Sequence, residues 1–533
     1  MPGAAGVEEP TGEAEAAGAA AGEAKPENAD PVDGGGTVGG RSDEGVLPEG
    51  SAGPERLRRW APGVLAAFLF CLYSAYAIAR HRNLYTGGFD LGIFDQAVRA
   101  YAAFEAPIVP IKGPGFNLLG DHFHPIIALL APLYWLWPHP VTLLVAQAAL
   151  IAVSAVPITR YALRRLGTGA GLTMSAMYGL SWGVQGAIGF DFHEIAFAVP
   201  MLAFAMVALA EHRWTAAVAW TLPLIFVKED MGLTVAAVGA YLCWRGSRRT
   251  GALLVVIGLG AVALTVKVLL PYFNTNGFSY SEFVEGGPFQ ALLGLPLGFG
   301  EHPGKAMPII MVLVITCGAA LRSPLTLLVI PGLLPRLISD NPFHWSIGGV
   351  HYNAPLMPVL FVATISALPA FAASRHRFAR RYGRVVIWVT VVSTLLPPMV
   401  VWNGMLVPDT YRLERHAVAA GRVLSMIPDG AAVAASNRLA PHLVDRAEVV
   451  LFPSRGDDRV DWVVIDTIYW AKEEASGASK PGREYIEARE RRAELGLDSP
   501  SSRQQSAALR TLGGRGFVQV ASEDGVLLFR RNR

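Results

Sequence analysis

The stretch HRNLYTGGFDLGIFDQAVRAYAAFEAPIVPIKGPGFNLLGDHFHP occupies residues 81–125, between the first long apolar run and the next. It is rich in ionisable side chains, which the neighbouring apolar runs lack. The Gly-Gly pair at 87–88 and the Gly-Pro-Gly sequence at 113–115 are typical of turns. Between them, apolar residues recur at helical spacing, which predicts a short amphipathic helix at a membrane surface. A polar segment held between membrane spans is where a membrane enzyme would keep its chemistry.

The composition is that of a membrane protein. Of 533 residues, 52% are hydrophobic and 17% are charged, and the mean hydropathy is +0.36. Many runs approach the ~20 apolar residues that cross a bilayer as a helix. We therefore predict a polytopic α-helical membrane protein with the lipid bilayer as a partner. Nothing in the composition indicates nucleic-acid binding, and the three cysteines form no CxxC motif.

Composition also divides the chain into three predicted domains. Residues 1–54 are acidic and poor in branched and aromatic side chains, so we expect a disordered tail. Residues 55–409 carry the apolar runs and are expected to form a transmembrane domain with an outer loop at 80–125. Residues 410–533 have a composition typical of soluble proteins, which predicts a small extracytoplasmic α/β domain.

The predicted C-terminal domain contains five short runs of buried β-type residues. Residues 471–505, rich in Glu and Arg, are expected to include a surface helix and a mobile loop. Asn437, just after the first strand, is expected to cap the following turn or to face the membrane cavity. The predicted strands are AVAAS (432–436), EVVLF (448–452), WVVID (462–466), FVQVA (517–521) and VLLFR (526–530).

Basic residues set the predicted orientation. Arg56, Arg58 and Arg59 precede the first apolar run, and positive residues stay cytoplasmic, so the N-terminus is predicted to lie inside. The same rule, applied to the later arginine clusters, predicts about eleven spans with the C-terminal domain outside. The short apolar piece at 126–137 is expected to be interfacial or re-entrant, because a span there would reverse the later loops.

On this topology, the polar clusters of the apolar region fall on the outer face. Ionisable residues near membrane depth are costly and are functional candidates by default. The alternative is that loops are polar in any case and supply caps and turns. The candidate catalytic residue is Asp90, and the candidate substrate- or donor-binding residues are Asp121, His122, His124, Asp191, His193, Glu194, Lys228, Glu229, Arg336 and His351.

Asp90 follows the Gly-Gly pair at the start of the predicted amphipathic helix. A partly buried carboxylate there would act as a general base, and the alternative is a helix N-cap. Asp95 is expected to face solvent or to pair with Arg99, one helical turn on. Lys228 and Arg336 are candidate phosphate contacts, with an interfacial ion pair and snorkelling to headgroups as the respective alternatives.

The motifs Asp121-His122-Phe123-His124 and Asp191-Phe192-His193-Glu194 both combine carboxylate and imidazole groups. Such ligands suit zinc or manganese, so a divalent metal is the one cofactor left open, with Asp121, His124, Asp191 and His193 as its ligands. Because the spacing matches no well-defined metal motif, we favour the alternative of a hydrogen-bonded His–Asp network without metal.

Four stretches, GGFDLGIFDQAVRAY, GDHFHP, GFDFHEIAF and VKEDMGL, resemble an uncharacterised family of bacterial polytopic membrane proteins, a domain of unknown function grouped with the GT-C glycosyltransferases. The resemblance extends from about residue 61 to the C-terminus. It implies a GT-C-like fold in the bacterial plasma membrane. Members of the wider class have an acidic residue in the first outer loop, and Asp90 occupies that place. The class often has two adjacent acids there, whereas this chain has Leu91 in the second position.

The resemblance implies a membrane glycosyltransferase. It would move a sugar from a polyprenyl-phosphate donor to a glycan, lipid or protein acceptor of the cell envelope on the outer face. Two alternatives remain open at this point. One is a metal-dependent membrane hydrolase or phosphotransferase that uses the Asp/His clusters. The other is a transporter, against which stands the lack of an inverted repeat in the sequence.

Overall fold

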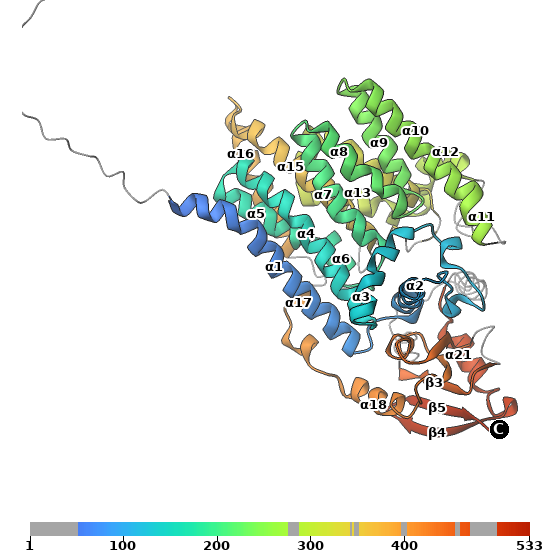
Figure 1. The fold of residues 1–533 in the computed structure, drawn as a ribbon. Helices are drawn as coiled ribbons and strands as arrows, with labels where there is room; N and C mark the ends of the chain where they lie inside the picture. The colour runs from blue at the N-terminus through green and yellow to red at the C-terminus, as the bar shows by residue number, and fades with distance from the viewer. Residues whose placement is uncertain are drawn as a thin grey trace, which may run out of the picture. The chain divides into compact units, whose positions relative to one another are not determined.

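The computed structural model describes residues 52–274, 287–339, 341, 344–345, 351–395, 402–453, 459–468 and 498–532. The tail expected to be disordered lies outside the described residues except for its last three. So does most of the stretch at 471–505 for which a surface helix and a mobile loop are expected. The described part is mostly helical, with a small sheet near the C-terminus (Figure 1).

Within the described residues, four helices are long and apolar enough to cross a membrane, judged by length and composition. The first, α1, packs along α4, and α15 packs against α4 and against α7 (Figure 1). Their central runs are rich in Leu, Ala and Val with few charges, and a helix lets such a run bond its backbone groups internally where lipid offers no partners. The four segments are Glu55–Arg82, Val141–Leu166, Arg248–Phe273 and His351–Ala372.

The remaining apolar helices are shorter, and several are interrupted by proline or end in 3₁₀ turns. The piece at 126–137 forms one of these, a 3₁₀ turn that continues into α3, too short to span on its own. The total of eleven spans stays a prediction. The α-helices are α1 Ala52–Arg82, α2 Ile93–Ala102, α3 Ala131–Leu136, α4 Val141–Leu166, α5 Thr168–Gly179, α6 Trp182–Ile188, α7 Ala198–Ala210, α8 Trp214–Thr221, α9 Met231–Trp244, α10 Arg248–Leu264, α11 Leu270–Phe273, α12 Pro288–Glu301, α13 Met307–Thr316, α14 Ile330–Leu337, α15 Leu356–Ala372, α16 Arg377–Leu395, α17 Trp402–Met405, α18 Arg415–Leu424 and α21 Ser502–Leu509.

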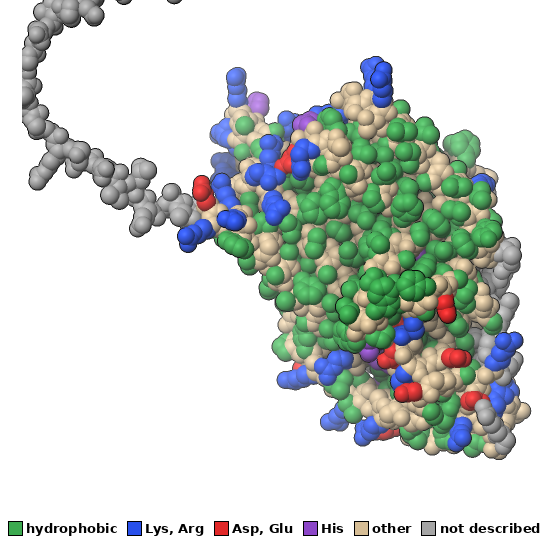
Figure 2. Space-filling view, viewed as in Figure 1, with side chains coloured by type: hydrophobic (Ala, Val, Ile, Leu, Met, Phe, Trp, Pro, Cys, Tyr) green, Lys and Arg blue, Asp and Glu red, His purple; other side chains and the backbone are tan. Residues whose placement is uncertain are grey.

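The surface agrees with a membrane location. Figure 2 shows hydrophobic side chains spread over the helical part, with Lys and Arg gathered near α16 and the start of α1. Charges of both signs cover the region of the C-terminal sheet in the same view. An apolar surface between charged ends is the pattern that a bilayer selects. The orientation in the membrane remains a prediction from the arginine distribution.

All five predicted strands are confirmed. They are β1 Ala432–Ala435, β2 Glu448–Leu451, β3 Trp462–Asp466, β4 Phe517–Glu523 and β5 Val526–Arg531. The sheet order is β2-β1-β3-β5-β4, with β1 parallel to β2 and β3, and β5 antiparallel to β3 and β4. The hairpin between β4 and β5 turns at Asp524-Gly525, both at positive φ, which fits the Asp-Gly preference of tight hairpins.

Helices α9 and α10 approach each other through two reciprocal glycine contacts. A Cβ at Gly251 would lie 2.5 Å from the carbonyl oxygen of Gly239, and one at Gly258 would lie 2.5 Å from that of Gly232. Small residues let the backbones of two helices come into contact, which strengthens the dispersion attraction between them. In a membrane this matters because the hydrophobic effect does not drive helices together in lipid. The two pairs therefore fix the helix that leads out of the Lys228 loop.

We predict that Gly251→Ala destabilises the protein by ~1–3 kcal/mol, because overpacking forces the two backbones apart. Gly260→Ala is the matched control, since a Cβ at that position of the same helix has nothing within 4 Å. Thermal unfolding in detergent, followed by size-exclusion fluorescence, measures the difference. Equal midpoints for the two variants would contradict the close approach.

Candidate functional site

Asp90 lies in a π-helical turn, Gly88–Gly92, that leads directly into α2. Gly87 occupies the N-cap position of this turn and Asp90 lies inside it, so the N-cap role considered for Asp90 is wrong. The Asp90 side chain is 32% exposed. It is therefore partly buried yet open to a substrate.

A histidine pair lies against Asp90. His193 Nε2 is 3.4 Å from Asp90 Oδ1, and the His193 ring stacks on that of His351 with centroids 3.7 Å apart. Burial alone would lower the pKa of His193, but its hydrogen bond to Asp90 and the charge of Asp90 raise that pKa above the ordinary value. His351 is 3% exposed, and neither of its ring nitrogens has a hydrogen-bond partner among the described residues.

Asp191 supplies a second carboxylate beside Asp90. Its Oδ2 accepts a hydrogen bond from the backbone N–H of Gly87 at 2.6 Å, while its Oδ1 has no partner in the described part of the chain. Burial, and then the negative charge of Asp90, raise the pKa of Asp191 to about 7. The sequence shows no second acid next to Asp90, but the fold brings one from a loop about a hundred residues away.

Two further loops join through ion pairs. Lys228 Nζ lies 3.3 Å from Glu194 Oε1, and His122 Nδ1 lies 2.7 Å from Glu229 Oε1. The other Glu229 oxygen accepts a hydrogen bond from the backbone of Phe123 at 3.2 Å. Because Glu194 follows His193 directly, these contacts connect the loops at 121–124, 191–194 and 228–230 to Asp90 in one continuous network.

His124 and Asp121 complete the first outer loop. His124 is buried against the Phe94 ring, and burial lowers its pKa to about 4. Asp121 forms an ion pair with Lys112 at 2.5 Å. Although burial alone would raise it, the charge of Lys112 lowers the pKa of Asp121. The sequence analysis missed Lys112, which a search for cations within the same loop would have found.

Arg336 approaches the network from α14. Its Nε donates to the carbonyl oxygen of His344 at 2.7 Å, and its guanidinium lies 5.6 Å from the centre of the Tyr352 ring. It is 8% exposed, and its Nη2 has no hydrogen-bond partner among the described residues. The Tyr352 ring in turn lies 4.3 Å from that of His351, centre to centre, which connects Arg336 to the stacked His351–His193 pair. Tyr352 is another site residue that the sequence analysis missed.

The arrangement is a hydrogen-bonded and ion-paired network. In the part of the chain that the structure describes, no group of three or more His, Cys, Asp or Glu side chains is placed to hold a metal ion. Of the four ligands considered, Asp121 is paired with Lys112 and His193 with Asp90. The geometry therefore fits the metal-free network better than a shared metal site.

Asp95 belongs to a structural cluster of its own. It is fully buried, pairs with Arg99 at 3.0 Å and accepts a hydrogen bond from the Tyr134 hydroxyl at 2.7 Å. The predicted Arg99 pair is confirmed and the solvent-facing alternative is wrong. The Tyr134 hydrogen bond joins α2 to α3, and so helps to fix the helix that begins at the Asp90 turn.

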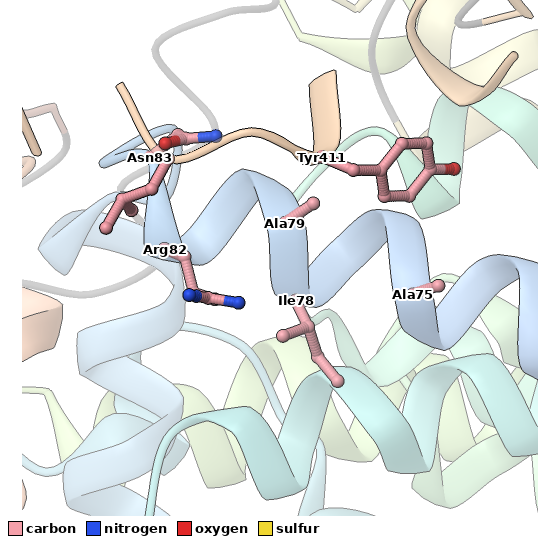
Figure 3. A pocket seen from close by; sticks show the side chains of 7 residues that line it. Ala75, Ile78, Ala79, Arg82, Asn83 and Tyr411 are labelled. Atoms are coloured by element: carbon pink, nitrogen blue, oxygen red, sulfur yellow. The ribbon is translucent and has the colours of Figure 1, made fainter. Parts of the chain in front are cut away.

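A separate cavity of about 230 Å³ lies at the end of α1 (Figure 3). Asn83 lies in its wall and donates hydrogen bonds to the carbonyl oxygens of Thr410 and Arg412, which tie the linker before α18 to α1. None of the candidate site residues lines it. The lining residues are Ala75, Ile78, Ala79, Arg82, Asn83, Tyr411 and Leu413.

Comparison with known proteins places the sequence in a family. No curated protein matches it. Among solved structures, the chain is similar to the crystal structure of ArnT from Cupriavidus metallidurans bound to undecaprenyl phosphate, with 12% sequence identity and a TM-score of 0.48, over 88% of this chain and 98% of that one. The family described as predicted membrane protein, DUF2079, matches residues 80–496, which is well over half of the chain. This protein therefore belongs to the DUF2079 family of predicted membrane proteins.

Proposed function

We propose that this protein is a membrane glycosyltransferase of GT-C type. It moves a sugar from a polyprenyl-phosphate donor to a glycan, lipid or protein acceptor of the cell envelope, on the outer face of the bacterial plasma membrane. The observation that carries the proposal is the partly exposed Asp90, supported by His193, in one network with Lys228 through Glu194 and with Arg336 through Tyr352 and His351. A base beside cations is what transfer from a phosphate donor to a hydroxyl requires.

In the proposed step, Asp90 takes the proton of the acceptor hydroxyl as that oxygen attacks the anomeric carbon of the sugar. The bond between the anomeric carbon and the phosphate oxygen breaks, and its electron pair leaves with the lipid phosphate. His193 holds the Asp90 carboxylate in position through their 3.4 Å contact. No metal is needed to balance this step.

The leaving phosphate needs positive charge in a site that excludes water. Arg336 offers a buried Nη2 group with no partner among the described residues, and Lys228 offers an ammonium that is paired with Glu194. A buried guanidinium N–H without a partner destabilises the protein, because it has lost its hydrogen bonds to water. An anion that accepts a hydrogen bond from this group removes the penalty, which favours anion binding. Because its pKa is raised to about 7, Asp191 carries a proton for about half of the time at neutral pH, which reduces its repulsion of the phosphate.

We predict that Asp90→Asn lowers the rate of sugar transfer by ~10²-fold or more, as expected for loss of a general base, while donor binding is kept. Asp429→Asn is the control, because Asp429 is exposed and forms an ion pair with Arg446 at 3.1 Å in the C-terminal part of the chain. Transfer is measured with a radiolabelled polyprenyl-phosphate sugar and membrane acceptors. Near-normal turnover by folded Asp90→Asn protein would rule out Asp90 as the base, and release of free sugar to water would favour a hydrolase.

We predict that Arg336→Gln weakens retention of the lipid donor by ~10–100-fold, because a charge-assisted hydrogen bond to phosphate is lost. Arg336→Lys keeps the charge and should retain part of the affinity. The control is Arg322→Gln, since Arg322 is exposed and contacts the Phe371 ring. Native mass spectrometry of co-purified polyprenyl phosphates measures the loss. Equal lipid occupancy in Arg336→Gln and Arg322→Gln would contradict a phosphate contact.

The raised pKa of Asp191 predicts a pH dependence of stability. Between its ordinary pKa of 3.8 and about 7, the folded protein holds a proton that the unfolded chain releases. Stability relative to an Asp191→Asn variant should therefore fall as pH rises through this window. Thermal midpoints of both proteins, measured from pH 4 to 7.5, should diverge by a few degrees. Parallel curves would show that Asp191 ionises normally in the folded state.

A further inference from the structure

Asn437, which follows β1, holds the turn that carries Asp90. Its backbone carbonyl oxygen accepts a hydrogen bond from the Gly88 N–H at 2.6 Å, and its side-chain Oδ1 accepts one from the Phe89 N–H at 2.7 Å. These two N–H groups belong to the residues just before Asp90. The following 3₁₀ turn has Leu439 at its N-cap and no side-chain cap bond, so the capping role expected for Asn437 is wrong.

Steric contacts explain why two glycines precede Asp90. A Cβ at Gly88 would lie 2.6 Å from the Cβ of Ala440, and a Cβ at Gly87 would lie 3.0 Å from Asn437 Nδ2. The Gly-Gly pair therefore does more than allow a bend in the chain. It lets the segment after β1 come into direct contact with the Asp90 turn.

The contact extends along the whole segment at 437–442. Arg438 donates to the carbonyl oxygen of Leu84 at 3.3 Å. Further along, the His442 ring stacks on that of His81 with centroids 4.2 Å apart. Four of the six residues in this segment thus contact the end of α1 or the Asp90 turn, which is too specific for an incidental surface contact.

We propose that Asn437 is a positioning residue for Asp90, so that the C-terminal sheet completes a site begun by the membrane helices. This inference rests on the proposed function of Asp90. The first N–H groups of a helical turn need acceptors, and Asn437 supplies two at fixed distances. These two hydrogen bonds set the direction in which the Asp90 side chain points from the turn. They thereby set the 3.4 Å distance between Asp90 and His193. Transfer then requires the sheet to be in place, although no residue of the sheet touches the reacting atoms.

The first test needs no activity. Hydrogen exchange of a peptide covering residues 84–93 should rise about tenfold in Asn437→Ala, because the Phe89 N–H loses its acceptor. Asn437→Asp retains a side-chain oxygen and should exchange like the wild type. Asn532→Ala is the control, since Asn532 is exposed at the end of the sheet. Unchanged exchange in Asn437→Ala would overturn the positioning role whatever reaction the protein performs.

The second test uses a compensating pair. Gly88→Ala should lower kcat about tenfold with the donor KM unchanged. The added methyl group would push the Asp90 turn away from Ala440 and so misplace the Asp90 side chain. Adding Ala440→Gly removes the nearest clashing atom and leaves the milder contacts with Leu451 Cδ2 at 3.2 Å and the Asn437 carbonyl oxygen at 3.3 Å. The double variant should therefore recover most of kcat, while Ala440→Gly alone stays near the wild type. Folded double-variant protein that fails to recover would overturn the proposal. If the exchange results hold and wild-type protein transfers no sugar, the proposed function fails and the positioning contact stands.

Discussion

The site depends on the pairing of charges that this apolar chain buries. Glu194 is 1% exposed, and its ion pair with Lys228 offsets the cost of removing both groups from water. Removing one partner would leave the other charge uncompensated in a dry environment. The pair also joins the loop before α7 to the loop before α9, so the requirement for charge balance determines how these helices meet. Asp90 and His193 are held in the network that results.

The sequence alone predicted the elements whose signal is local. The five strands follow from short runs of β-branched and aromatic residues, and the long helices from apolar runs of span length. The short helices were harder, because prolines such as Pro324 and Pro303 begin 3₁₀ turns that shorten the α-helical part of an apolar run. Hydropathy reports that a run is apolar but not where its helix breaks, so the span count stays open.

The candidate residues could be listed from the sequence, but their partners could not. Asp90 and Asp191 are recognisable in the sequence as polar residues in an apolar setting. Their proximity in space depends on the packing of helices such as α4 and α6, which lie between them in the sequence. Asn437 was read as a local cap because local capping is the commonest role of such a residue. Its true partner, Phe89, is 348 residues away in the chain. Contacts of that kind come from tertiary packing, which no local pattern encodes.

The distance along the chain between Phe89 and Asn437 has a consequence for biosynthesis. The membrane helices emerge from the ribosome long before the strand that precedes Asn437, so the Asp90 turn is made early and its acceptor is made late. An unfinished or truncated chain would therefore insert its helices in the bilayer while the Phe89 N–H still lacks the Asn437 side chain as its acceptor.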